Sequence, residues 1–181
     1  MGIYNIANKA IFLDRDGVLN KSIVRRGKPY SPYLIEDIVI PEGVKSGLLK
    51  LKKRDFLLIM ITNQPDISRG KLTLNSLNKI NNFLSKELLL DDVFSCIHDD
   101  KDNCLCRKPK TGMITDAILK WKIDINRSFL VGDRWKDIEA GKRMNLKTIL
   151  INQNYKEKKI EPDYEFTSFL EVTNQILKLS K

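Results

Sequence analysis

Two aspartates, Asp14 and Asp16, directly follow the short apolar run of residues 10–13. At this spacing both carboxylates can point to one side of the chain while Arg15 points away. Two ionised carboxylates that close repel each other unless a cation lies between them. A divalent metal would provide that cation. Because carboxylate oxygens are hard ligands, the pattern favours Mg2+, with Asp133 as the source of one more oxygen. Asp137, four residues further on, could reinforce the site directly or through water.

A metal-neutralised aspartate can attack phosphorus and form an aspartyl-phosphate intermediate. A second aspartate can protonate the leaving oxygen and afterwards take a proton from the attacking water. The charge that develops on the phosphoryl oxygens needs fixed donors, which the Thr62 hydroxyl and the Lys108 ammonium can provide. The Asp-x-Asp-Gly motif alone could equally be an acidic turn. Residues 62–63, 107–109 and 132–133 follow it in an order that favours phosphoryl transfer.

All three cysteines and the single histidine of the chain lie between positions 96 and 106. They form the pattern C-x-H-x5-C-x-C, made of Cys96, His98, Cys104 and Cys106. Thiolate and imidazole groups suit tetrahedral Zn2+, and four protein ligands leave no open position for water, so the predicted site is structural. We expect this site to fold the zinc loop, residues 96–106, which the basic pair Arg107 and Lys108 follows directly.

Two other interpretations of this cluster stay open at the level of sequence. The residues could be three free buried cysteines and an incidental histidine. They could also belong to a zinc ribbon that binds nucleic acid, which the net charge would suit. Neither interleaved aromatic residues nor a separate basic module accompanies the cluster, and this argues against nucleic acid as a partner.

Apolar runs of strand length alternate with segments of helical period. Strands are predicted at residues 10–13, 56–62, 93–97, 129–132 and 148–151, with a weaker one at 163–166. Helices are predicted at 44–51, 74–88, 114–121, 137–144 and 169–179. The alternation predicts an α/β fold, a three-layer Rossmann-like domain with a mostly parallel sheet and helices on both faces. Ligands of such sheets bind beyond the carboxyl ends of the strands, which is where the polar motifs stand.

The length of 181 residues and mass of 20.9 kDa fit a single domain over residues 1–181. Residues 21–61 and 64–107 separate the motifs and leave no room for an inserted cap domain, so we expect an open site whose specificity is set by loops. The segment 21–40 is basic, and Arg25 within it could engage a second phosphate of a substrate. A solvated basic loop is the other interpretation of this segment.

The motifs FLDRDGVLN, ITNQ, CRKP and VGDRWKDIEAG resemble, in this order, the motifs of the haloacid-dehalogenase-like phosphatases. The resemblance runs from about Ala10 to Ile151. Through the Cys/His pattern it is narrower, to the capless zinc-containing branch that includes D-glycero-D-manno-heptose 1,7-bisphosphate phosphatases and the histidinol-phosphate phosphatase domain. It implies Asp14 as the nucleophile and Asp16 as the general acid and base.

The same resemblance implies that Thr62 and Lys108 stabilise the phosphoryl group. It implies that Mg2+ is held by Asp14, the backbone carbonyl of Asp16, and Asp133. It also matches three residues to positions that contact or orient substrate: Asn63, Arg107 and Arg134.

We therefore expect a magnesium-dependent phosphatase that acts on a small phosphorylated sugar. The specific expectation is the 7-phosphate of D-glycero-D-manno-heptose 1,7-bisphosphate, in the biosynthesis of nucleotide-activated heptose. A histidinol-phosphate phosphatase is the alternative, because it shares the zinc spacing and the Gly-Asp-Arg form of the last motif. Residues 18–20 and 67–70 are closer to the heptose branch.

Lys and Arg number 32 against 23 Asp and Glu, a net charge of +9. Such a charge could indicate a polyanionic partner, but a small anionic substrate accounts for part of it equally well. The chain contains no apolar run near the ~18 residues of a membrane span, and its start lacks a secretory pattern. We expect a cytoplasmic monomer that binds neither nucleic acid nor membrane.

Overall fold

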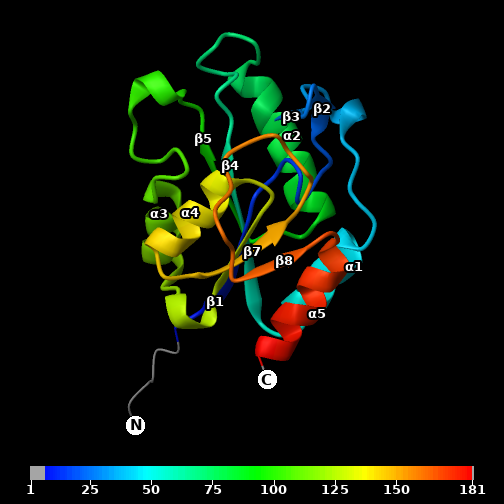
Figure 1. Ribbon diagram of the computed structural model, residues 1–181, viewed down its shortest axis with the longest axis vertical. Helices are drawn as coiled ribbons and strands as arrows, with labels where there is room; N and C mark the ends of the chain where they lie inside the picture. Colours follow the sequence, from blue (N-terminus) through cyan, green and yellow to red (C-terminus); the bar gives the residue numbers. More distant parts are fainter. Residues whose placement is uncertain (1–6, 181) are drawn as a thin grey trace.

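The computed structural model describes residues 7–180 of the chain (Figure 1). Six strands form one sheet in the order β5-β4-β1-β6-β7-β8, and every neighbouring pair in it is parallel. The strands are β1 (Lys9–Leu13), β4 (Phe56–Asn63), β5 (Asp92–Cys96), β6 (Phe129–Gly132), β7 (Lys147–Ile151) and β8 (Tyr164–Phe166). Each begins and ends within one residue of its prediction.

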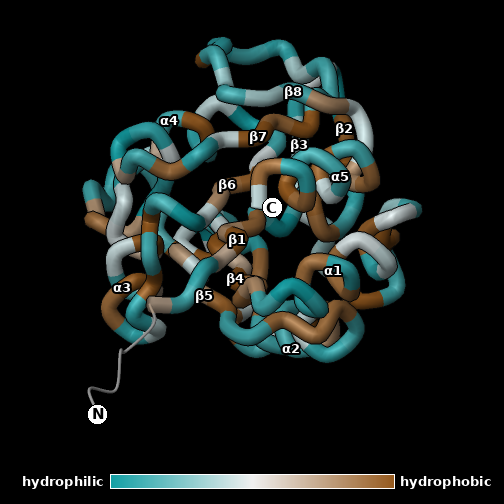
Figure 2. The backbone as a smooth tube through the Cα atoms, turned by 90° about the horizontal axis from the view of Figure 1, so that it is seen from below, coloured by the Kyte–Doolittle hydropathy of each residue, from teal (hydrophilic) through white to brown (hydrophobic). Residues whose placement is uncertain are grey.

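Five helices cover the two faces of the sheet, so the predicted three-layer arrangement is confirmed (Figures 1 and 2). They are α1 (Val44–Lys52), α2 (Leu74–Glu87), α3 (Gly112–Trp121), α4 (Trp135–Arg143) and α5 (Phe169–Leu179). Buried residues of α1, α2 and α5 pack with one face, and those of α3 and α4 with the other. Neighbouring residues of one strand, such as Ile11 and Phe12 of β1, belong to different clusters, because successive side chains of a strand point to opposite faces.

The apolar run of β4 is continuous because this strand lies inside the sheet and is covered by helices on both sides. Two of the helices, α2 and α5, begin at residues whose side chains accept from the free backbone N–H groups of the first turn. The Thr73 side chain accepts from the Ser76 N–H at the start of α2, and Ser168 with Glu171 forms a capping box at the start of α5. Sequence periodicity and local capping therefore indicate the same elements.

Segment 21–40 differs from its interpretation as a loop. It contains the antiparallel hairpin β2 (Ile23–Arg25) and β3 (Lys28–Tyr30), followed by a single 3-10 turn at residues 35–37. The hairpin turn consists of Arg26 and Gly27, which both have positive φ, at 52° and 77°. Positive φ at both central positions matches the twist of a two-residue hairpin. Because arginine seldom takes this conformation, the turn was not visible in the sequence.

The strand order places β4, β1 and β6 side by side, so the polar residues that follow these strands meet at one edge of the sheet. No cap domain interrupts the chain between these strands over residues 7–180. None of the helices in that range has the length and apolar run that crossing a membrane requires.

The close contact of α1 with α5 can be tested by substitution at Gly47. A Cβ atom on Gly47 would overlap the Thr173 hydroxyl and lie 3.0 Å from a ring carbon of Phe169. Gly47→Leu should therefore lower the free energy of unfolding by about 1–3 kcal/mol through overpacking, although leucine is the better helix former. Urea denaturation measures the change. Ser46→Leu, at the exposed neighbouring position, is the control and should be neutral or stabilising. Equal stability of the two variants would contradict the described contact.

Candidate active site and zinc loop

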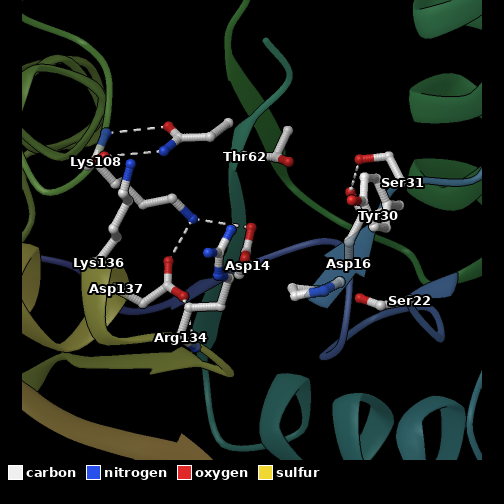
Figure 3. A pocket seen from close by; sticks show the side chains of 12 residues that line it. Asp14, Asp16, Ser22, Tyr30, Ser31, Thr62, Lys108, Arg134, Lys136 and Asp137 are labelled. Atoms are coloured by element: carbon white, nitrogen blue, oxygen red, sulfur yellow. Dashed lines mark hydrogen bonds and ion pairs between the residues drawn. The ribbon is translucent and has the colours of Figure 1, made fainter. Parts of the chain in front are cut away.

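A small cavity of about 70 Å³ opens where β1, β4 and β6 end (Figure 3). Its lining comes from elements that are far apart in the sequence. Asp14 follows β1, Thr62 ends β4, Lys108 follows the zinc loop and Asp137 lies on α4. The hairpin contributes its end, where Tyr30 and the following residue line the cavity. The fold therefore gathers the polar residues that the sequence suggested at the carboxyl edge of the sheet.

Three buried carboxylates lie together beside this cavity. Asp14, Asp133 and Asp137 each offer an oxygen, and these oxygens lie within 4.8 Å of one another. The ammonium of Lys108 is 2.9 Å from Asp14 Oδ1 and 2.6 Å from Asp137 Oδ1, and it also donates to the backbone carbonyl of Ile61 at 2.8 Å. One buried positive charge thus faces three carboxylates.

Asp133 is not paired with this lysine. Both of its carboxylate oxygens are buried and form no hydrogen bond of ordinary geometry within residues 7–180, although Tyr155 and the charge of Arg134 lie close enough to lower its pKa. Burial, together with the charges of Asp14 and Asp137, raises the pKa of Asp133 well above its usual range. Gly17, at φ 93°, permits the close approach, because a Cβ there would overlap the Asp133 carboxylate. Burying a carboxylate without a hydrogen-bond or charge partner costs free energy, and a bound cation that prefers oxygen ligands would remove that cost. The cluster therefore fits a hard divalent ion such as Mg2+.

Asp14 is also a buried carboxylate close to other negative charges. Burial raises its pKa to about 6, against the lowering effect of Lys108. Its Oδ1 accepts from Lys108 and from the backbone N–H of Arg15, the latter at 2.7 Å. These are the contacts that the Asp14 carboxylate forms with donors in the described range, and both go to the same oxygen.

The Asp16 carboxylate turns away from this cluster. It accepts from Arg15 through Nε at 3.2 Å and Nη2 at 2.9 Å, from Asn20 at 3.0 Å and from Gln64 at 2.8 Å. The expectation that the side chains of Asp14 and Asp16 share one ion, with Arg15 pointing away, is wrong. Strand alternation no longer applies after β1 ends at Leu13, because the chain enters a turn there. The metal contact of the Asp16 backbone carbonyl stays a prediction.

The surroundings of Asp16 favour its ionised form. Burial alone would raise its pKa, but the charge of Arg15 and the hydrogen bonds from Arg15, Asn20 and Gln64 lower it below the usual value. The hydroxyl of Ser31, just after the hairpin, also donates to Asp16 Oδ2 at 2.8 Å (Figure 3). Neither Arg15 nor Ser31 was found by sequence reasoning. Only the position of Gln64 in the ITNQ motif hinted at a polar partner.

Thr62 and Asn63 end β4 beside the lysine. The Thr62 hydroxyl accepts from Gln64 Nε2 at 2.8 Å. The Asn63 amide pairs with the backbone of Lys108 in both directions, and each hydrogen bond is 3.0 Å long. Asn63 therefore holds the peptide that carries Lys108, and its contact with a substrate stays a prediction.

The four residues of the Cys/His cluster converge. Cys106 Sγ is 3.1 Å from Cys96 Sγ and 3.5 Å from Cys104 Sγ, and Cys96 Sγ is 3.6 Å from Cys104 Sγ. His98 Nδ1 is 3.7 Å from Cys96 Sγ and 3.4 Å from Cys106 Sγ. Tetrahedral zinc with bonds of about 2.0–2.3 Å has ligand separations of roughly 3.4–3.8 Å. Burial raises the pKa of the Cys96 and Cys106 thiols, whose protons zinc would displace. The donor set fits a closed Zn2+ site.

The three basic residues predicted to contact the substrate do not lie together in the structure. Arg107 donates to Asp100 in the zinc loop at 2.8 Å, and Arg134 donates to Glu157 at 2.6 Å. Both line a larger cavity, of about 460 Å³, next to the first, and Arg134 lines the first cavity as well. Arg25 is exposed on β2, with its guanidinium 5.9 Å from the centre of the Tyr30 ring, and does not line either of these two cavities.

Comparisons with known proteins agree with this geometry. Residues 105–176 match a family model described as HAD-hydrolase-like. The chain is 36% identical to the D-glycero-beta-D-manno-heptose-1,7-bisphosphate 7-phosphatase of Helicobacter pylori, over 81% of this chain and 85% of that protein. It is 35% identical to the D-glycero-alpha-D-manno-heptose-1,7-bisphosphate 7-phosphatase of Campylobacter jejuni, over 82% and 86%.

One solved structure is also similar. It is the D,D-heptose 1,7-bisphosphate phosphatase of B. bronchiseptica, complexed with magnesium and phosphate. The TM-score is 0.81 at 25% identity, and the match covers 94% of this chain and 99% of that one.

Neutralising Asp133 tests the metal site. Asp133→Asn removes a buried charge, so it should raise the Tm of the Mg2+-free protein by a few degrees and abolish any further rise when Mg2+ is added. The measurement is thermal unfolding of the zinc-loaded protein with and without Mg2+. Asp116→Asn, at an exposed position on α3, is the control and should keep the response. A variant of Asp133 that is still stabilised by Mg2+ would refute the site.

The same experiment has a predicted pH dependence. The pKa of Asp14 is raised from 3.8 to about 6, so the folded protein binds more protons than the unfolded chain between these values. The contribution of Asp14 to the stability of the Mg2+-free protein therefore falls as the pH rises through this window. Because Mg2+ needs the ionised carboxylate, its stabilising effect should grow from pH 5 to pH 7.5.

Removing one ligand tests the zinc loop. The purified protein should contain about one zinc per chain, and Cys106→Ser should lose it together with much of the stability of the loop. Elemental analysis measures the metal content. Leu105→Ser is the matched control, since Leu105 lies between two of the ligands and its side chain is 79% exposed. Zinc retained in the Cys106 variant, or absent from the wild type, would rule out the assignment.

Proposed function

The chain belongs to the haloacid-dehalogenase-like phosphatases, and from this premise we propose that it removes the 7-phosphate of D-glycero-D-manno-heptose 1,7-bisphosphate. The chemistry rests on one observation: Asp14 lines the cavity beside Lys108, and one of its oxygens lies within 4.8 Å of the buried carboxylate of Asp133. The substrate is supported by the relatives named for this reaction, of which the chain covers most of the length.

The first step is an attack of Asp14 on phosphorus. Its Oδ1 is occupied by Lys108 and by the Arg15 backbone N–H, which leaves Oδ2 as the attacking atom. A bond forms between Oδ2 and phosphorus while the bond from phosphorus to the sugar oxygen breaks. The leaving oxygen takes a proton from Asp16 and departs as an alcohol. Asp16 gains that proton when the substrate binds, because a phosphate dianion beside it raises the pKa of its carboxyl.

The second step returns the enzyme to its starting state. A water molecule gives a proton to Asp16 and attacks phosphorus, and the bond from phosphorus to Asp14 breaks. When the phosphate leaves, Asp16 returns to solvent the proton that it took up from solvent when the substrate bound, and its carboxyl is ionised again. In both steps the Lys108 ammonium and the Thr62 hydroxyl stabilise the charge on the phosphoryl oxygens. Mg2+ bound by Asp14, Asp133 and the backbone carbonyl of Asp16 would supply positive charge opposite the transferred group.

The adjoining cavity suits a second phosphate. Its lining contains six cationic side chains against three carboxylates. The cations are Lys28, Arg69, Arg107, Arg134, Lys136 and Lys156, and the carboxylates are Asp66, Asp100 and Glu157. A bisphosphorylated sugar complements this excess of positive charge. Histidinol phosphate fits it less well, because it carries one phosphate and an ammonium group.

A panel of phosphate esters tests the substrate. We expect kcat/KM for the heptose bisphosphate to exceed that for histidinol phosphate by about 100-fold or more, since a second site-matched phosphate contributes several kcal/mol. Both anomers of the heptose ester are included. A preference for histidinol phosphate would overturn the proposed substrate.

Asp14→Asn tests the covalent mechanism. The amide cannot attack phosphorus, so kcat should fall on the order of 10⁴-fold or more while zinc content and fold are unchanged. Steady-state phosphate release on the heptose ester measures the loss, and Asp116→Asn serves as the control. Substantial turnover by the Asp14 variant would show that the nucleophile has been assigned incorrectly.

A further inference from the structure

Among residues 7–180, Arg15 has the largest side chain that is completely buried, with 0% of its surface exposed. Arginine is almost never buried in this way unless its N–H groups are paired. Here Nε donates to Oδ1 of Asp16 at 3.2 Å and Nη2 donates to Oδ2 at 2.9 Å. The planar guanidinium therefore binds both oxygens of the carboxylate of the next residue in the chain. The side chain therefore turns inward, toward the residue that lines the cavity.

The far side of the guanidinium is anchored in the core. Nη1 donates to Asn81 Oδ1 on α2 at 3.1 Å, and Nη2 donates to Gln64 Oε1 after β4 at 2.9 Å. Asn81 is itself held, because its amide donates to Ser95 Oγ on β5 at 3.0 Å. The guanidinium cannot rotate without breaking contacts to a helix and to the segments of two strands.

Stability alone does not account for this arrangement. Withdrawing a guanidinium and a carboxylate from water costs about as much as their attraction returns, and apolar side chains of similar volume usually pack as well. What the planar fork adds is direction, since two parallel N–H groups fix the orientation of a carboxylate. The carboxylate that is oriented here belongs to Asp16, on the wall of the cavity.

The cavity side of the same carboxylate is held differently. Oδ2 accepts from the Ser31 hydroxyl at 2.8 Å, and Ser31 is a half-buried residue at the end of the hairpin (Figure 3). A substrate oxygen can replace this hydroxyl, whereas it cannot reach the Arg15 side. Oδ2 also accepts from Arg15 and Gln64, and Oδ1 from Asn20, and these three donors are buried. Among the described residues, the half-buried Ser31 is therefore the partner that a substrate oxygen can replace.

We propose that Arg15 is a positioning residue of the phosphatase reaction: anchored on Gln64 and Asn81, it holds the Asp16 carboxylate toward the leaving oxygen of the substrate. The inference rests on the proposed function, in which Asp16 transfers the proton, and it assigns Arg15 no contact with the substrate. A misdirected Asp16 would impair proton transfer while the phosphorylation of Asp14 itself stayed possible.

The leaving group provides a specific readout. A sugar alkoxide needs a proton in order to leave, whereas p-nitrophenolate leaves without one. The value of kcat/KM includes only the steps up to the phosphorylation of Asp14, so it isolates this difference from the later attack of water. Arg15→Lys keeps the charge and loses the fork. It should lower kcat/KM about 10- to 100-fold on the heptose bisphosphate and less than about threefold on p-nitrophenyl phosphate.

A second variant acts without touching Asp16. Asn81→Leu removes the anchor of Nη1 and should cause the same selective loss at smaller size, about 3- to 10-fold on the heptose ester. Asn82→Leu, at the exposed next position of α2, is the matched control and should match the wild type on both esters. Thermal unfolding and the response to Mg2+ establish that each variant is folded. If Arg15→Lys does not fold, Asn81→Leu decides the question.

The outcomes are distinct. Selective loss on the heptose ester in either folded variant supports the inference. Equal losses on both esters, or no loss, in folded variants of an active enzyme overturn it and leave the proposed function intact. A wild-type protein that hydrolyses neither ester overturns the proposed function, and this inference with it.

Discussion

The structure depends on the balance of charge around one buried lysine. Lys108 pairs with Asp14 and Asp137, and Asp133 beside them forms no hydrogen bond of ordinary geometry within residues 7–180. Three carboxylates in a dry site repel one another strongly, and one ammonium cannot neutralise them. A protein that keeps such an arrangement needs a divalent cation or protonated acids. The excess of negative charge lowers the stability of the metal-free protein, but it also places Asp14 beside a site for a cation. A cation bound there would neutralise the charge of Asp14, and a neutralised carboxylate can approach a phosphate ester.

Several distant parts of the chain serve to hold that lysine. Asn63 pairs with the backbone of Lys108, and the carbonyl of Ile61 accepts from its ammonium. The zinc loop ends at residue 106, so only Arg107 separates it from Lys108. A closed four-ligand metal site gives rigidity to a loop that has little apolar surface of its own. The zinc loop and the end of β4 therefore act on the same point of the site, although they share no sequence pattern.

The two aspartates of the first motif have opposite surroundings. Asp14 lies among other carboxylates, which together with burial raises its pKa to about 6, whereas Asp16 is surrounded by donors that lower its pKa. Neighbouring groups with pKa values shifted apart are typical of a site that divides nucleophilic and acid–base work. The difference arises within three residues of chain because the backbone turns sharply after β1. Arg15, between them, is what keeps the two carboxylates from sharing one environment.

The sequence by itself determined the α/β alternation, the positions of the six strands of the sheet, the Cys/His cluster, and Asp14 and Asp133 of the carboxylate cluster, since periodicity and ligand spacing are local properties of the chain. It also indicated which residues stand at strand ends, and a parallel sheet brings such residues to one edge. Only the tertiary structure decided the direction of each side chain there. Arg15 faces inward rather than away, Asp137 joins the carboxylates of Asp14 and Asp133, and Arg25 lies on a hairpin outside both cavities. These outcomes depend on hydrogen-bond partners far away in the chain, such as Asn81 and Gln64, and on a turn whose positive φ values arginine rarely adopts.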